Sequence, residues 1–190
     1  SSLGRTARGN PASYTGVFTS IREFFGTSSE AAEAGASPAD FSFNSGKGRC
    51  PHCAGTGWEH VEMQFLSDIY LPCPVCRGRR WQDWILAVRP ELDDGVRRSI
   101  DEVLDLTVEE AAAAFANHPA IMKSLSLLSL TGLGYLKLGQ PLSTLSGGER
   151  QRLKLAARIA EGIPQKHRRS DAAWNGPLFV FDEPTTGLHF

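Results

Sequence analysis

The sequence lacks the features that would place it in a membrane or outside the cell. No apolar run approaches the roughly 20 residues that a helix needs to cross a bilayer, and the polar N-terminus shows no secretory signal. These absences predict a cytoplasmic protein. The net charge is only -1, so the chain as a whole is not a polycation. Basic residues cluster locally, however, and such patches are compatible with nucleic-acid binding.

An initiator methionine is also missing, and the chain stops at Phe190 in the middle of a motif. We therefore expect a piece of a longer protein. Its 190 residues, of which 41% are hydrophobic and 22% are charged, suffice for a globular core. The composition divides the chain into a connecting segment at 1–40, a cysteine-bearing module at 41–90 and a third part at 91–190.

Local signals predict helices in much of the chain and one strand near its end. Thr107 and Glu110 form a capping-box pattern that opens a helix, and Pro119 disfavours helix just before itself. The predicted elements in chain order are a loop over 1–20, a short helix at Ile21–Phe25, a flexible connection or weak helix over 26–40, helices from Thr107 to near Asn117, over 119–130 and after Ser146, and a strand at Leu178–Phe181.

The cysteines form two C-x-x-C pairs separated by nineteen residues: Cys50 with Cys53, and Cys73 with Cys76. One tight turn presents two thiolates to one ion, and two such turns complete the tetrahedral shell of four sulfurs that zinc accepts. Two disulfides are an alternative, but they suit secreted proteins. A redox pair is another, but it requires no second copy. The spacing therefore predicts a structural zinc site that is closed to catalytic water.

Basic and aromatic side chains follow the second cysteine pair. Arg77, Arg79 and Arg80 suit a DNA phosphate backbone, and the nearby Trp81 and Trp84 suit stacking on bases. A solvated charged turn over a small aromatic core is the alternative. Between the two pairs, partial alternation of Val61, Met63 and Phe65 with polar residues predicts a strand or hairpin arm.

The segment Ser146-Gly147-Gly148-Glu149 predicts a helix start that binds phosphate. Ser146 is the N-cap and Glu149 its reciprocal partner in a capping box, and the helix should run through Ile159. Its exposed N–H groups and positive dipole end attract an anion, and the two glycines let a phosphate come close. An ordinary helix start is the alternative, because capping boxes are common.

Two carboxylates, Asp182 and Glu183, end the predicted strand. A carboxylate at the C-terminal end of a strand can hold magnesium through water. The adjacent Glu183 can orient or deprotonate an attacking water molecule. A plain turn is the alternative. Together with the Ser146 helix start, the pair favours a catalytic nucleotide site in which Glu183 and Asp182 are the catalytic residues.

Taken together, these motifs resemble the UvrA family of the ABC excinuclease, the DNA-damage sensors of bacterial nucleotide excision repair. LSGGE at 145–149, followed by FVFDEPTTGLH at 179–189, resembles the signature motif and the Walker B/D-loop of ABC-type ATPases. GRTARGNPASYTGVF at 4–18 and the cysteine segment at 48–80 resemble the same family. The resemblance covers nearly all of the chain and points to the second, C-terminal ATPase half.

The resemblance implies an α/β fold, namely the signature and Walker B portion of an ABC-type ATPase with an inserted zinc-binding module. Residues 1–40 would be the segment after the Q-loop, 41–90 the zinc module, and 91–190 the signature and Walker B portion. The P-loop and the Q-loop glutamine would lie upstream of Ser1. The switch histidine would lie downstream of Phe190.

The resemblance also implies two nucleotide sites that are each built from separate pieces. Ser146, Gly147 and Gly148 would face an ATP held by the P-loop of the other ATPase half. Asp182 and Glu183 would serve a different ATP and its magnesium. The isolated chain should therefore not hydrolyse ATP.

Damaged double-stranded DNA would lie across the zinc and signature regions, and the matching residues of the opening segment are Arg5, Arg8, Asn10 and Tyr14. The other implied partners are the second ATPase half of the same chain, a second copy of the full-length protein and UvrB, the next component of the excinuclease.

Two alternatives remain open from the sequence. The long basic stretch EGIPQKHRRSDAAWNGP at 161–177 and Arg150 depart from the family pattern. They fit a UvrA-like paralogue in resistance to DNA-binding antibiotics. The other alternative is an ABC ATPase coupled to a membrane transporter, for which a four-cysteine module has no evident use.

Overall fold

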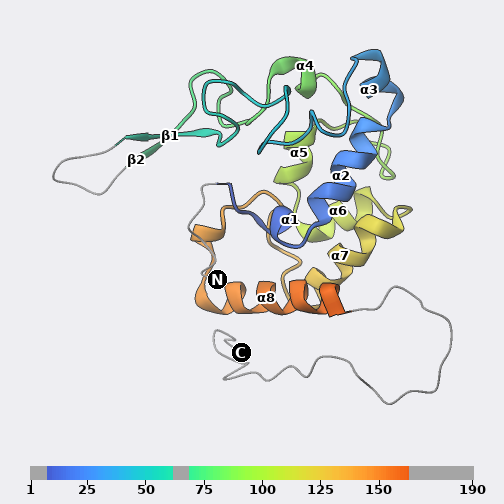
Figure 1. Cartoon of the computed structure of the whole chain (residues 1–190). Coiled ribbons are helices and arrows are strands. Elements are labelled where there is room, and N and C mark those ends of the chain that lie inside the picture. Colours follow the sequence, from blue (N-terminus) through green and yellow to red (C-terminus); the bar gives the residue numbers. More distant parts are fainter. Residues whose placement is uncertain (1–7, 62–68, 163–190) are drawn as a thin grey trace.

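The computed structural model describes residues 8–61 and 69–162, and within these ranges the chain is mainly helical (Figure 1). No helix in the described ranges is long and apolar enough to cross a membrane. The predicted strand Leu178–Phe181 lies outside them. The elements in chain order are α1 (Pro11–Tyr14), α2 (Val17–Gly26), α3 (Ser29–Glu33), β1 (Trp58–Val61), β2 (Ile69–Pro72), α4 (Asp83–Leu86), α5 (Ile100–Asp105), α6 (Val108–Ala114), α7 (Pro119–Leu130), the 3-10 turn η1 (Leu142–Thr144) and α8 (Gly147–Gly162).

The prediction of a loop over residues 1–20 is wrong for residues 11–14 and 17–20, which lie in α1 and α2. Asn10 caps α1, since its side chain accepts a hydrogen bond from the Ser13 N–H at 2.8 Å, and Pro11 suits the first helical turn. Gly16, with a φ of 79°, turns the chain between the two helices. Pro11 and Gly16 thus delimit two short helices instead of preventing them.

The helix predicted at Ile21–Phe25 is confirmed as the second half of α2. Of the two predictions for residues 26–40, the weak helix is the one observed. It is the short α3, which begins after its N-cap Ser28.

The central helix of the helical body is α7, which contacts α2, α6 and α8. Its range matches the prediction of a helix over 119–130, and Pro119 occupies its first turn. Ile121, Leu125 and Leu128 are buried along one face, at the spacing of an amphipathic helix. This face anchors the helices that precede and follow α7.

The capping box predicted for α6 is confirmed. The Thr107 N–H donates to Glu110 Oε2 at 2.8 Å, and the Glu110 N–H donates to Thr107 Oγ1 at 3.2 Å. The helix ends at Ala114, somewhat before the predicted end near Asn117. It ends there because Phe115 leaves helical geometry, with a φ of -128°, and its side chain is fully buried in the core.

The strands β1 and β2 form an antiparallel hairpin in which Trp58 lies opposite Pro72 and Val61 opposite Ile69. It projects from one side of the molecule (Figure 1). Most of its side chains are exposed, and a two-stranded hairpin alone is marginal in water. The predicted hairpin arm is confirmed, although Met63 and Phe65 lie outside the described residues. Its stability must come from its base, where the cysteines lie.

One hydrophobic core joins the cysteine-bearing module to the helices. Phe41, Phe43 and Trp81 belong to the same buried cluster as residues of α2, α7 and α8. The Phe43 ring centroid lies 4.9 Å from that of Phe18 in α2 and 5.7 Å from that of Trp81. Because residues from 1–40, 41–90 and 91–190 all enter this cluster, these ranges fold against one another. The boundaries between them stay a prediction.

Candidate functional site

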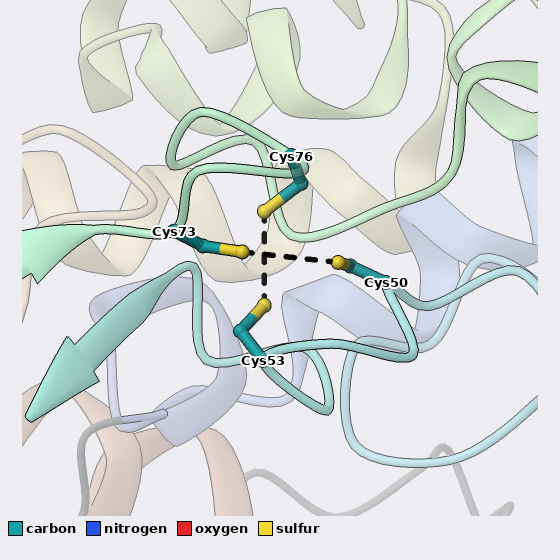
Figure 2. Close-up of side chains that lie close together, drawn as sticks. All are labelled: Cys50, Cys53, Cys73 and Cys76. Atoms are coloured by element: carbon teal, nitrogen blue, oxygen red, sulfur yellow. Dashed lines mark hydrogen bonds between the residues drawn. The ribbon is translucent and has the colours of Figure 1, made fainter.

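The four cysteine sulfurs converge on one point, as Figure 2 shows, and all four residues are buried. The Sγ atoms of Cys50 and Cys73 are 4.0 Å apart, those of Cys53 and Cys76 are 3.6 Å apart, and all four lie within 4.8 Å of one another. Sulfurs placed at about 2.3 Å around a zinc ion form a tetrahedron with edges of about 3.8 Å. A disulfide would need about 2.05 Å. The set is therefore compatible with zinc and contains no disulfide.

Tight turns direct backbone N–H groups at these sulfurs and tie the two pairs together. The Gly57 N–H donates to Cys53 Sγ at 3.3 Å, and the Gly57 carbonyl accepts from the Cys73 N–H at 2.9 Å. Gly55 has a φ of 82°, and a Cβ there would overlap the carbonyl oxygen of Phe43. Glycine is thus required where the first turn passes the core.

On their own, the thiols of this cluster differ in acidity. Burial alone would raise the pKa of Cys53, but hydrogen bonds from the Gly57 N–H and from Cys76 outweigh it and lower the value to about 7. Burial raises the pKa of Cys50, and it raises that of Cys76 to about 12. Several thiolates in so small a volume need a cation between them, which is the behaviour of a metal site.

The three arginines after Cys76 lie in different environments. Arg77 is exposed. Arg79 Nε donates to Asp101 Oδ2 at 2.9 Å, which joins the second cysteine turn to α5. Arg80 is only 7% exposed, and its guanidinium lies 5.0 Å from the centroid of the Phe43 ring. Arg80 therefore belongs to the core beneath the cysteines and is not an exposed DNA contact in this structure.

The two tryptophans proposed for base stacking also lie in different environments. Trp81 is 1% exposed and donates from Nε1 to the Phe41 carbonyl at 3.1 Å, which leaves no ring face for a base. Trp84 is 37% exposed. A cleft of about 420 Å³ lies beside this turn, and Arg77, Arg79 and Lys137 are among the residues that line it.

The helix α8 begins with the predicted capping box. The Ser146 N–H donates to Glu149 Oε2 at 2.7 Å, and the Glu149 N–H donates to Ser146 Oγ at 3.2 Å. Ser146 and Gly147 are exposed, whereas Gly148 is buried. A Cβ added to Gly147 would meet nothing within 4 Å. The N-terminus of α8 is therefore an open surface suited to an anion, and the identity of that anion stays a prediction.

One residue at this helix start, Tyr135, was not predicted from the sequence. Its hydroxyl donates to Glu149 Oε1 at 2.6 Å. This bond and the one from the Ser146 N–H hold the pKa of Glu149 below its ordinary value. Burial and the Glu149 carboxylate raise the pKa of Tyr135. No spacing rule signals this contact, since it depends on the loop after α7 folding back over the start of α8.

The described part of the opening segment runs beside the chain that leads into α8. The Ala12 N–H donates to the Leu138 carbonyl, and the Leu142 N–H donates to the Gly9 carbonyl, both at 3.0 Å. These bonds bring residues that are more than a hundred positions apart next to each other. The opening segment is thereby fixed near the signature helix, as the shared resemblance to one family would require.

The predicted DNA contacts in this segment are not equivalent. Arg8 Nη2 donates to the Ala54 carbonyl at 2.8 Å, within the first cysteine turn. Asn10 is fully buried and caps α1, so its role is structural, whereas Tyr14 is 39% exposed. Arg5 lies outside the described residues. Asp182 and Glu183 also lie outside them, and their catalytic role stays a prediction.

Comparisons with known proteins bear on this site. No family model matches the chain. It is 51% identical over 190 residues to UvrABC system protein A of Methanothermobacter thermautotrophicus and 48% identical over 190 residues to that of Thermus thermophilus. All of the chain and 18% of each relative are covered. Along its whole length the chain is similar to these UvrA proteins, and it corresponds to a segment of them.

A solved UvrA-family structure has the same fold. The crystal structure of UvrA2 from Deinococcus radiodurans superposes with a TM-score of 0.83 at 45% sequence identity, over 98% of this chain and 21% of that one. The likeness supports an ABC ATPase-type fold, and the resemblance inferred from the motifs is confirmed. Since the chain spans only 18% of the length of the curated relatives, the activity of a whole protein is a matter for proposal.

Proposed function

We propose that this chain is the signature-bearing part of the second ATPase half of a DNA-damage-recognition protein in nucleotide excision repair. The observation that carries the proposal is the identity of 51% and 48%, along the entire chain, with two proteins named UvrABC system protein A. These names favour neither an antibiotic-resistance paralogue nor a transporter-coupled ATPase. The full-length protein would act in the cytoplasm as a homodimer, together with UvrB.

The metal of this protein is a structural zinc held by Cys50, Cys53, Cys73 and Cys76. The support is the distances of 4.0 Å and 3.6 Å between the sulfurs, which lie on either side of the edge of about 3.8 Å expected for four sulfurs around zinc. All four positions are filled by protein ligands, so the ion would hold the base of the β1–β2 hairpin and would not activate water. One zinc per chain is the expected content, and Cys73→Ser should lose it.

The nucleotide is ATP with magnesium, divided between two composite sites. Ser146, Gly147 and Gly148 at the start of α8 contact the γ-phosphate held by the other ATPase half. Asp182 and Glu183 serve the ATP of this half's own P-loop. The support is the N-terminus of α8, where Ser146 and Gly147 lie exposed on the surface. Neither site is complete in this chain, so the isolated segment should be inactive.

The experiment compares ATP turnover by the full-length protein and by its Gly147→Ala variant. Because a Cβ at Gly147 meets no neighbour within 4 Å, the substitution leaves the fold intact but intrudes on the anion surface. Turnover should fall about tenfold or more, with unchanged thermal unfolding. Full turnover by Gly147→Ala, or turnover by the isolated segment that Glu183→Gln abolishes, would contradict the proposal.

Damaged double-stranded DNA is the proposed substrate, and it would bind on the side of the molecule that carries the four cysteines. Arg77 and Arg79 on the second cysteine turn, with Arg8, Tyr14 and Arg5, are the proposed contacts. Asn10 and Arg80 are buried, so this proposal does not include them. The supporting observation is the cleft of about 420 Å³ that Arg77, Arg79 and Lys137 help to line.

A further inference from the structure

Arg80 holds a backbone conformation that is unfavourable for an arginine. Its φ is 74°, in the left-handed region that residues with a side chain seldom adopt. The conformation lets its backbone join the two cysteine turns, since Arg80 lies four residues after Cys76 and its carbonyl accepts from the Cys50 N–H at 2.8 Å. A glycine would serve this backbone without strain. The side chain therefore needs a separate explanation.

That side chain places a cation inside the protein. Arg80 is 7% exposed, and its Nη1 is buried without a hydrogen-bond partner. Within the described residues no carboxylate pairs with it, and a buried unpaired charge is strongly destabilising. Its side chain packs on the cysteine turns, since Arg80 Cγ lies 3.1 Å from the position that a Cβ on Gly57 would take, and the Gly57 N–H donates to Cys53 Sγ. The four buried sulfurs beside it become negative when they bind a metal.

A zinc ion with four thiolates carries two surplus negative charges, because four thiolates outweigh one divalent cation. We infer that Arg80 is the buried counter-charge of the four-cysteine centre and that it slows the loss of its metal. Arg8 adds a second cation beside the first cysteine turn, where its Nη2 donates to the Ala54 carbonyl at 2.8 Å. The inference rests on the proposed zinc and is independent of ATP hydrolysis and DNA binding.

The cysteine turn offers a matched control. Arg77 is also an arginine in the left-handed region, with a φ of 55°, but it is exposed. Arg80→Gly and Arg77→Gly therefore both relieve backbone strain, and both remove one positive charge. Only Arg80→Gly removes a charge that is buried beside the sulfurs.

The experiment measures zinc release from the full-length protein to a coloured chelator. Arg80→Gly should release zinc about tenfold faster or more, as expected when a group supporting metal ligands is lost, whereas Arg77→Gly should stay within about twofold of wild type. Release from Arg80→Gly at the wild-type rate overturns the inference. A wild-type protein without zinc overturns it together with the zinc proposal.

A second pair of variants separates charge from packing. Arg80→Lys keeps a cation on a long stem, and Arg80→Met keeps only the stem. Retention of zinc by Arg80→Lys and rapid loss by Arg80→Met support the counter-charge. Equal release by the two variants shows that the site needs only a filled volume, and this overturns the inference while leaving the zinc centre itself in place.

Discussion

Glu149 connects two parts of the chain at the start of α8. Its Oε2 accepts from the Ser146 N–H at 2.7 Å, and its Oε1 accepts from the Tyr135 hydroxyl at 2.6 Å. The first bond is local and fixes the first turn of the helix. The second bond attaches that turn to the loop after α7. The orientation of the exposed first turn of α8 therefore depends on a side chain outside the signature motif.

We expect Tyr135→Phe, which removes the hydroxyl that donates to Glu149, to destabilise the protein by about 1 kcal/mol. A hydrogen bond to a charged group contributes about 1.5–3 kcal/mol when buried, but Tyr135 is 56% exposed, and solvent reduces the effect. Chemical denaturation monitored by circular dichroism measures the difference. Tyr70→Phe is the control, because Tyr70 stacks on His60 through its ring. An equal loss in both variants would contradict the assigned bond.

The same pair of residues gives a dependence on pH. The Tyr135 and Ser146 bonds lower the pKa of Glu149 from its ordinary value of 4.5. Their stabilisation is therefore complete above that value and is lost as the pH falls through the lowered pKa of the folded protein. The stability difference between wild type and Tyr135→Phe should shrink in acid. A difference that grows below pH 4.5 would show that the carboxylate is not the partner.

How well the sequence predicts a contact depends on how far apart its two residues lie along the chain. The capping boxes at Thr107 and at Ser146 were predicted, because donor and acceptor lie three residues apart, whereas those at Asn10 and Ser99 were not. The bond from Tyr135 and the burial of Arg80 depend on loops that meet only in the folded chain. No local pattern encodes them, so Arg80 resembled its exposed neighbour Arg77 in the sequence.

At the scale of elements, the two cysteine turns differ in how closely they approach the core. Gly55 and Gly78 both adopt left-handed backbone, with φ values of 82° and 84°. A Cβ on Gly55 would overlap the Phe43 carbonyl oxygen, whereas a Cβ on Gly78 meets nothing within 4 Å. The first turn is packed against the core at this point, and the second has open space beside it.

We therefore expect Gly55→Ala to lower the unfolding temperature and the zinc content far more than Gly78→Ala. The latter bears only the strain of the left-handed region, about 1–2 kcal/mol. Gly55→Ala bears the same strain and must also displace the chain at Phe43. Thermal unfolding with parallel metal analysis measures both variants. Similar losses would mean that strain alone governs these turns.

The second cysteine turn also carries the prediction about DNA. Arg77→Ala in the full-length protein should weaken DNA binding and reduce the salt slope by about 1, which is the expected effect of losing one phosphate contact. Arg97→Ala is the control, since Arg97 is exposed and pairs with Glu30 at 2.8 Å. Binding titrations over a range of salt concentrations measure the slope. An unchanged slope for Arg77→Ala would remove this turn from the interface.

The helices α6, α7 and α8 were predicted closely, and α7 matches its predicted range, whereas α5 was not predicted although Ser99 opens it with a capping box. The opening helices α1 and α2 were partly missed, because glycine and proline signal breaks without saying whether short helices fill the intervals. Their stability comes from the core, where Ala12, Phe18 and Ile21 are buried. Such tertiary support has no local signature.

At the scale of the whole molecule, the four-cysteine cluster and the helices rest on one hydrophobic core. Phe41, Phe43 and Trp81 flank the cysteines in sequence, yet they lie in the same core as α2, α7 and α8. The resemblance of the motifs predicted a zinc module inserted in an ATPase portion, and it left the extent of their contact open. Because the core is shared, loss of the metal should destabilise the helices as well as the hairpin.

We therefore expect zinc removal to lower the unfolding temperature of the helices as well as that of the hairpin. Without the metal, the cysteine turns lose the ion that joins them, and the aromatic residues beside them lose their fixed positions. Helical circular dichroism, measured during heating with and without a strong chelator, reports this. The transition should move down as one cooperative unit. A helical transition that stays in place while zinc leaves would show that the module folds independently and that the shared core transmits nothing to α7 and α8.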